Sequence, residues 1–96
     1  MQLTPASAQS FTLVCPAEFT FKDQQEFNQY LQQALAQQAK QLVLDLSGTN
    51  YIDSAAIGLL LLACKECNRQ DCSCMITGAK GYVGDLLKNL KINALQ

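Results

Sequence analysis

The chain has 96 residues, of which 49% are hydrophobic, and its formal net charge is -1. This length suits a single small domain over residues 1–96, with one core and no room for a deep substrate cleft. Only 7 lysine and arginine side chains are present. Binding to nucleic acid or to anionic lipid needs clustered cations, so we expect neither.

No targeting signal is evident in the sequence. Residues 1–15 carry no lysine or arginine, so we expect no signal peptide. The longest apolar run, residues 55–64, is far shorter than the roughly 20 residues that a membrane span needs. The five cysteines then fit a reducing compartment, and their odd number argues against a closed disulfide framework. We expect a cytoplasmic protein with no membrane insertion.

The N-terminal quarter predicts short strands. Residues 1–10 are small and polar, and are expected to be loose or to form an edge strand. Apolar side chains alternate over residues 10–14, which predicts a strand that ends before Pro16. Residues 18–21 repeat the alternation and predict a second short strand.

The clearest amphipathic helix is predicted for residues 23–39. Asp23 is suited to cap its first turn, and Glu26 three residues later completes a capping-box pattern. Glutamines occupy most of one side, which indicates a solvated face. The apolar face consists of Phe27, Tyr30, Leu31, Ala34 and Leu35.

The central sequence predicts a buried strand followed by a helix. Residues 41–46, QLVLDL, are almost continuously apolar, as in a strand buried on both faces, and Asp45 is expected to bond the loop that follows. Residues 47–50 are turn formers. Residues 55–68 predict a second helix, apolar nearly all round at its start and therefore largely buried.

Residues 73–77 predict another strand and residues 81–89 a third helix, although Gly84 weakens the helical pattern. Alternating strands and helices predict an α/β fold with a mixed sheet of about four strands and three helices. The loop after residues 41–46 then brings Asp53 and Ser54 to a helix N-terminus, where α/β folds usually place function.

The Asp53-Ser54 junction has two interpretations. Either residue could cap the helix, since the first turn leaves backbone N–H groups unpaired. Alternatively, a hydroxyl at this place is a phosphate acceptor. A phosphate would add close to two negative charges beside an apolar surface and would repel Asp53.

The stretch VLDLSGTNYIDSAAIGLLLLACKE, followed by a short strand and a V-x-x-L-L-x-x-L helix, resembles a STAS domain. This is the fold of the bacterial anti-sigma factor antagonists. The resemblance extends from about Phe19 to Leu90. It is greatest to the single-domain proteobacterial antagonists of partner-switching systems for biofilm formation, motility or secretion.

The resemblance implies a regulatory switch without catalysis. The unphosphorylated domain binds an anti-sigma factor or a serine-kinase switch protein. Phosphorylation by the kinase releases the domain, and a PP2C-like phosphatase restores it. The expected contact surface consists of Thr49, Asn50, Tyr51, Asp53, Ser54, Ala55, Ala56, Ile57 and Gly58.

The sequence departs from the family at the phosphate acceptor. The family pattern is Asp-Ser-Ser-Gly or Asp-Ser-Ser-Ala, with the second serine as the usual acceptor. Here Asp53 and Ser54 match its first two residues, whereas Ala55 stands at the acceptor position and Ala56 at the next. Ala55 is then an engineered phospho-null substitution or a natural change that gives a constitutively active antagonist, or else Ser54 serves as the acceptor.

The alternative function is that of a STAS subunit in a phospholipid-transport ABC complex. Such subunits are similar in sequence, and some have small residues at this junction. A fixed subunit would hold its partner permanently, whereas the antagonist would be controlled by charge at residue 55.

Four cysteines with the spacing C-x2-C-x4-C-x-C have three interpretations: core packing, a zinc site or a redox role. They are Cys64, Cys67, Cys72 and Cys74. The first pair is predicted on a helix, whereas zinc knuckles usually place it on a loop. We therefore expect core packing, with no metal and no cofactor.

The remaining candidates are weaker. The glycines of residues 77–85, TGAKGYVGD, match no phosphate-binding motif and are expected to be turn residues. Asp45 and Asp53 could form a carboxylate pair, but the chain has no histidine, and we expect no enzyme activity.

Overall fold

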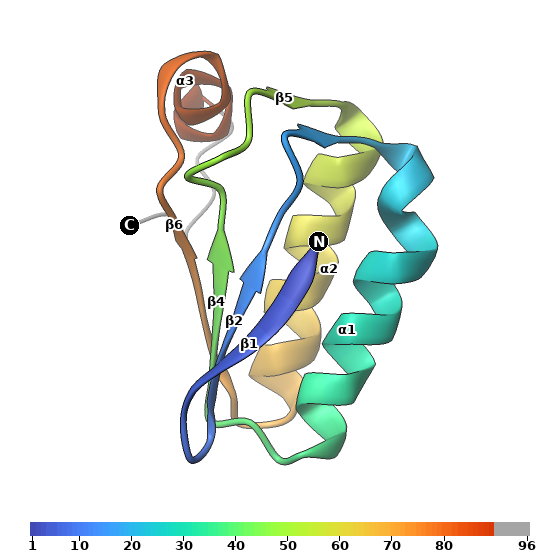
Figure 1. Cartoon of the computed structure of the whole chain (residues 1–96), viewed down its shortest axis with the longest axis vertical. Helices are drawn as coiled ribbons and strands as arrows, with labels where there is room; N and C mark the ends of the chain where they lie inside the picture. The colour runs from blue at the N-terminus through green and yellow to red at the C-terminus, as the bar shows by residue number, and fades with distance from the viewer. Residues whose placement is uncertain (90–96) are drawn as a thin grey trace.

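The structure, a computed structural model, describes residues 1–89. Figure 1 shows its elements in chain order. The strands are β1 (Gln2–Ser7), β2 (Ser10–Val14), β3 (Glu18–Phe19), β4 (Gln41–Asp45), β5 (Tyr51–Ile52) and β6 (Ser73–Thr77). The helices are η1, a 3-10 turn (Phe21–Asp23), α1 (Gln24–Ala36), α2 (Ser54–Arg69) and α3 (Gly81–Asn89). Leu90, which ended the predicted third helical pattern, lies outside the described residues.

The main sheet has four strands in the order β1-β2-β4-β6. β1 pairs antiparallel with β2, and β2, β4 and β6 are parallel. The expected α/β architecture, with a mixed sheet of four strands and three α-helices, is confirmed. Of the two options for the N-terminal residues, the edge strand is the one observed. None of the helices within residues 1–89 combines the length and apolarity required to cross a membrane.

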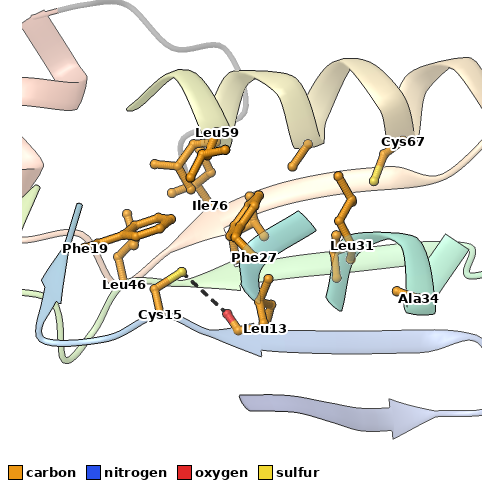
Figure 2. Packing of buried hydrophobic residues seen from close by; sticks show 14 of the residues in the cluster. Leu13, Cys15, Phe19, Phe27, Leu31, Ala34, Leu46, Leu59, Cys67 and Ile76 are labelled. Atoms are coloured by element: carbon orange, nitrogen blue, oxygen red, sulfur yellow. Dashed lines mark hydrogen bonds between the residues drawn. The ribbon is translucent and has the colours of Figure 1, made fainter. Parts of the chain in front are cut away.

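Helices α1 and α2 lie on the same side of this sheet (Figure 1) and enclose the core with it. Figure 2 shows side chains from both helices meeting those of the strands. The rings of Phe19 and Phe27 pack with centroids 5.5 Å apart. The largest fully buried side chains also include Leu13, Leu31, Leu42, Leu44, Leu46, Ile52, Leu60 and Ile76.

The prediction that the QLVLDL strand is buried on both faces is wrong. In β4, Leu42 and Leu44 are fully buried, whereas Gln41, Val43 and Asp45 are only half-buried. The difference arises because α1 and α2 both cover the same face of the sheet (Figure 1). The opposite face of β4 therefore keeps some contact with solvent.

The strand predicted over residues 18–21 is shorter and lies outside the main sheet. Of these residues only Glu18–Phe19 forms a strand, which pairs in parallel with β5 in a separate two-stranded sheet. Thr20 then starts the 3-10 turn. This small sheet places the chain before α1 beside the chain before α2, which matters for the site described below.

The capping box before α1 differs from the one predicted. The backbone N–H of Thr20 donates to the Asp23 carboxylate at 2.9 Å, and the Thr20 hydroxyl accepts from the N–H of Lys22 at 3.3 Å. Asp23 thus serves as the acidic partner of Thr20 and makes no side-chain cap for α1 itself. The helix also ends at Ala36, earlier than predicted, and Gln38 follows with a φ of 59°.

The parallel strands β2, β4 and β6 end at one edge of the sheet. There the Leu46 N–H donates to the Thr77 carbonyl at 2.8 Å. The Asp45 carboxylate accepts from the Ser47 N–H at 2.9 Å, which confirms its expected bond to the following loop. Gly78, just after β6, has a φ of 77°, and a Cβ there would lie 2.8 Å from Cβ of Ser47.

We predict that Gly78→Ala lowers the free energy of unfolding by roughly 1 to 3 kcal/mol, because alanine is strained at this φ and its Cβ meets Ser47. Gly48→Ala is the matched control, since a Cβ at Gly48 has no neighbour within 4 Å. Urea denaturation measures both variants. Equal midpoints for the two would contradict the close approach of the two loops.

Candidate functional site

Asp53 stands between β5 and α2 and caps the helix. Its backbone is extended, with φ -99° and ψ 176°, and its Oδ1 accepts from the Ala56 N–H at 2.8 Å. The Asp53 carbonyl oxygen accepts the N–H of Ile57 at 3.1 Å. The cap is therefore Asp53 and not Ser54, which settles the choice that the sequence left open.

The second carboxylate oxygen of Asp53 links α2 to the turn before α1. Oδ2 accepts from the backbone N–H of Phe21 at 3.1 Å, although the two residues are 32 positions apart. The Asp53 N–H in turn donates to the Phe19 carbonyl at 3.2 Å, as part of the β3–β5 pairing. One carboxylate thus holds the start of α2 against the chain that leads into α1.

Thr49 and Ala56, two of the nine residues expected at the contact surface, lie in the interior. The side chain of Thr49 is 1% exposed, and its hydroxyl donates to the Pro16 carbonyl at 2.8 Å. Ala56 is fully buried. Both residues position the loop and the first helical turn, and their side chains offer no area to a partner.

The other expected contact residues reach the surface. Ser54, Ala55 and Gly58 are exposed on α2, Ile57 and Asp53 are half-buried, and Asn50 and Tyr51 are exposed before the helix. The Tyr51 ring stacks on that of Tyr82, at the start of α3, with centroids 6.3 Å apart and an interplanar angle of 9°. The loop and α3 therefore present a continuous aromatic edge beside the start of α2.

Phe21 and Tyr82 were not expected at the site. They are 61% and 57% exposed. Phe21 lies two residues after Phe19, the last residue of β3, and β3 pairs with β5, which contains Tyr51. In the sequence Phe21 alternates with Phe19, and this pattern predicts a strand. It does not indicate that Phe21 is exposed at the site. A hollow of about 400 Å³ lies here, lined by Glu18, Thr20, Phe21, Lys22, Asp23, Tyr51 and Asp53.

The prediction that α2 is largely buried is only partly right. Leu59 and Leu60 are buried, but Leu61 and Leu62 are 48% and 41% exposed. One side of the helix packs on β6 and α1, so its other side faces solvent. We call the N-terminal part of this side the outer face of α2, which consists of Ser54, Ala55, Gly58, Leu61 and Leu62. These five residues carry no charge, and Lys65 is exposed one turn further along the helix.

The cysteines divide into two kinds. Cys15, Cys67 and Cys72 are buried, as expected for core packing, and Figure 2 shows the Cys15 thiol donating to the Leu13 carbonyl, at 3.9 Å. Burial raises the pKa of the Cys15 thiol to about 12. Cys64 and Cys74 are half-buried, with their Sγ atoms 3.2 Å apart. Within residues 1–89, no set of three or more Cys, Asp or Glu side chains is arranged to hold a metal ion.

We predict that Asp53→Ala lowers the free energy of unfolding by roughly 1 to 3 kcal/mol, since it leaves the N–H groups of Ala56 and Phe21 without their acceptor. Ser54→Ala, at the adjacent exposed residue, is the control and should change stability little. Amide hydrogen exchange gives the specific readout, because the Phe21 N–H should exchange faster in Asp53→Ala alone. Unchanged exchange at Phe21 would argue against the link between the two helices.

Comparisons with known proteins agree with this fold. The model of the STAS domain matches residues 5–96. No curated protein matches the sequence significantly. Among solved structures, the chain is similar to "Structure of the Anti-Sigma Factor Antagonist SpoIIAA in its Unphosphorylated Form", with a TM-score of 0.79 and 11% identity over 99% of this chain and 86% of that chain.

Two further structures are similar. The Bacillus cell fate determinant SpoIIAA in the phosphorylated form has a TM-score of 0.81 and 11% identity, covering 99% of this chain and 87% of that one. A sulfate transporter family protein from Wolinella succinogenes has a TM-score of 0.74 and 13% identity, covering 93% and 70%. At these identities the likeness shows the fold alone. Because the family model covers nearly the whole sequence, however, the chain belongs to the STAS-domain family.

Proposed function

We propose that this STAS-domain protein is an anti-sigma factor antagonist, which binds an anti-sigma factor or a serine-kinase switch protein through the start of α2. The observation that carries the proposal is the exposed, uncharged outer face of α2, which includes Ala55, the residue that the family resemblance places at the phosphate acceptor. The shared fold with SpoIIAA, an anti-sigma factor antagonist known in phosphorylated and unphosphorylated forms, supports it.

The surroundings of residue 55 are suited to control by charge. A phosphate there would add close to two negative charges. Both Asp53 oxygens already accept backbone N–H groups, so its carboxylate stays in place beside the new charge. A partner covering Leu61 and Leu62 would then have to remove the phosphate from water, which is costly unless the partner supplies cations.

Ala55 removes this control in the present chain. We propose that the chain remains in its binding state and that a PP2C-like phosphatase has no substrate at residue 55. Ser54 is the nearest hydroxyl, and it is exposed in the first turn of α2. Because a phosphate on Ser54 would lie beside the same surface, phosphorylation there remains the competing route to a switch.

The first test compares Ala55→Asp with Ala55→Asn, which differ in charge but hardly in volume. Ala55 is exposed, and an acid in the first turn of a helix is compatible with folding. We predict that Asp weakens partner binding roughly tenfold or more, whereas Asn preserves it. Quantitative affinity capture from cells that make the protein, read by mass spectrometry, measures both. An anti-sigma factor or kinase retained equally by both variants would contradict the proposal.

Phosphorylation of Ser54 requires its own measurement. Incubation with the captured kinase and ATP, followed by phosphopeptide mapping, should find no phosphate on this chain and a phosphate on residue 55 of Ala55→Ser. A phosphate on Ser54 of the unaltered chain, with loss of the partner, would show that Ala55 does not block the switch.

A second pair of variants tests the outer face of α2. A Cβ at Gly58 has no neighbour within 4 Å, so both Gly58→Ala and Gly58→Glu should fold and gain helix propensity. We predict that Glu weakens capture of the partner roughly tenfold or more and that Ala changes it little. Circular dichroism checks the fold of both. Normal capture by Gly58→Glu would place the partner elsewhere.

The second candidate function is a fixed STAS subunit of a phospholipid-transport ABC complex. The observation that favours it is the exposure of Leu61 and Leu62, since a permanent interface is more apolar than a transient one. In this case the Ala55→Asp and Ala55→Asn baits should both retain the same transporter ATPase. The capture experiment therefore separates the two functions.

A further inference from the structure

Two cysteines meet at the open edge of the main sheet. Cys64 lies on α2 and Cys74 on β6, and their Sγ atoms are 3.2 Å apart. Within residues 1–89, β6 is the last strand of the sheet on this side. Cys74 points to the same face as the buried Ile76 but stays half-buried, as Cys64 does. The pair is therefore next to the core and still open to small reagents.

The number of possible ligands argues against a metal site. A structural zinc site takes four protein ligands. Among residues 1–89, no group of three or more Cys, Asp or Glu side chains is arranged to hold a metal ion. A disulfide bond of about 2.05 Å requires the sulfurs to approach by roughly a further 1.2 Å.

We propose that Cys64 and Cys74 form a redox-active dithiol, which a small disulfide of the glutathione type oxidises to a bond between α2 and β6. This inference goes beyond the proposed partner binding and does not depend on it.

Either thiol can be the donor in the hydrogen bond between Cys64 and Cys74. Donation by Cys74 lowers the pKa of Cys64 and raises that of Cys74. A thiolate is the attacking species in disulfide exchange. The proposal therefore takes Cys64 as the attacking thiol and Cys74 as the resolving one.

The reaction balances in two exchange steps. The Cys64 thiolate attacks one sulfur of the small disulfide, so that a mixed disulfide forms and one small thiolate leaves. Cys74 then loses its proton and attacks Sγ of Cys64, which releases the second small thiolate. Two protein thiols are oxidised and one small disulfide is reduced to two thiols. In the mixed disulfide, Sγ of Cys64 has no negative charge. It therefore no longer accepts the hydrogen bond that kept the proton on Cys74, and Cys74 can ionise.

Cys67 is the main competitor. Hydrogen bonding from Cys74 lowers the pKa of Cys67 to about 7, and it lies one turn from Cys64 on α2. The side chain of Cys67 is nevertheless 0% exposed, so an external disulfide cannot reach it in the folded protein. Exposure therefore selects Cys64.

The test equilibrates the folded protein with mixtures of reduced and oxidised glutathione, blocks free thiols by alkylation, and digests with trypsin without reduction. Cleavage after Lys65 and Arg69 separates the competing cysteines. Cys64 falls in residues 41–65, Cys67 in residues 66–69, and the other pair in residues 70–80. We expect residues 41–65 joined to residues 70–80, with fragment ions that place the bond at Cys74.

The variants provide the controls. Cys64→Ser and Cys74→Ser should each abolish the joined peptide, whereas Cys15→Ala should leave it unchanged, and circular dichroism checks that each is folded. The expected bond is measured in the unaltered chain, so that result does not depend on whether a variant folds. A bond between residues 41–65 and 66–69, a mixed disulfide that never resolves, or free thiols at every glutathione ratio would each overturn the proposal.

Discussion

The parallel pairing of β2, β4 and β6 is the constraint on which the rest of the structure depends. It brings the ends of all three strands to one edge, where the Leu46 N–H bonds the Thr77 carbonyl and Gly78 passes against Ser47. Each crossover must then return over the sheet through a helix. With α1 and α2 on one side, the loops before both helices emerge together at this edge (Figure 1).

The sequence predicted those elements whose signal is local. The strands at residues 10–14 and 73–77 have the predicted bounds, and the third helix begins at residue 81 as predicted, since alternation and helical spacing are properties of short windows. Burial was harder to predict. The apolar runs in β4 and α2 suggested complete coverage, but coverage depends on which face of the sheet the helices take, and a single strand does not encode that choice.

The helix start at the candidate site was predictable from the sequence, but the hydrogen bonds that hold it in place were not. Turn residues after a buried strand, followed by Asp53 and a helical run, sufficed to locate the helix start. The bond from Phe21 N–H to Asp53 could not be foreseen, because it joins residues 32 positions apart that meet only through the β3–β5 pairing. The predicted capping box pairs Asp23 with Glu26, whereas the structure pairs Asp23 with Thr20. The reason is related, because the alternating pattern of residues 18–21 predicts a strand that includes Thr20.

The side chains of Asp53 and Thr49 make the hydrogen bonds that hold this corner of the fold, and the side chain at residue 55 takes no part in them. This side chain is exposed, and the difference in helix propensity between alanine and serine is below about 0.7 kcal/mol. The alanine codons GCN and the serine codons UCN differ by a single base, so under the proposed function a lineage could acquire or lose phosphorylation here in one mutational step without passing through an unstable protein. The regulation proposed for this position can therefore evolve independently of folding.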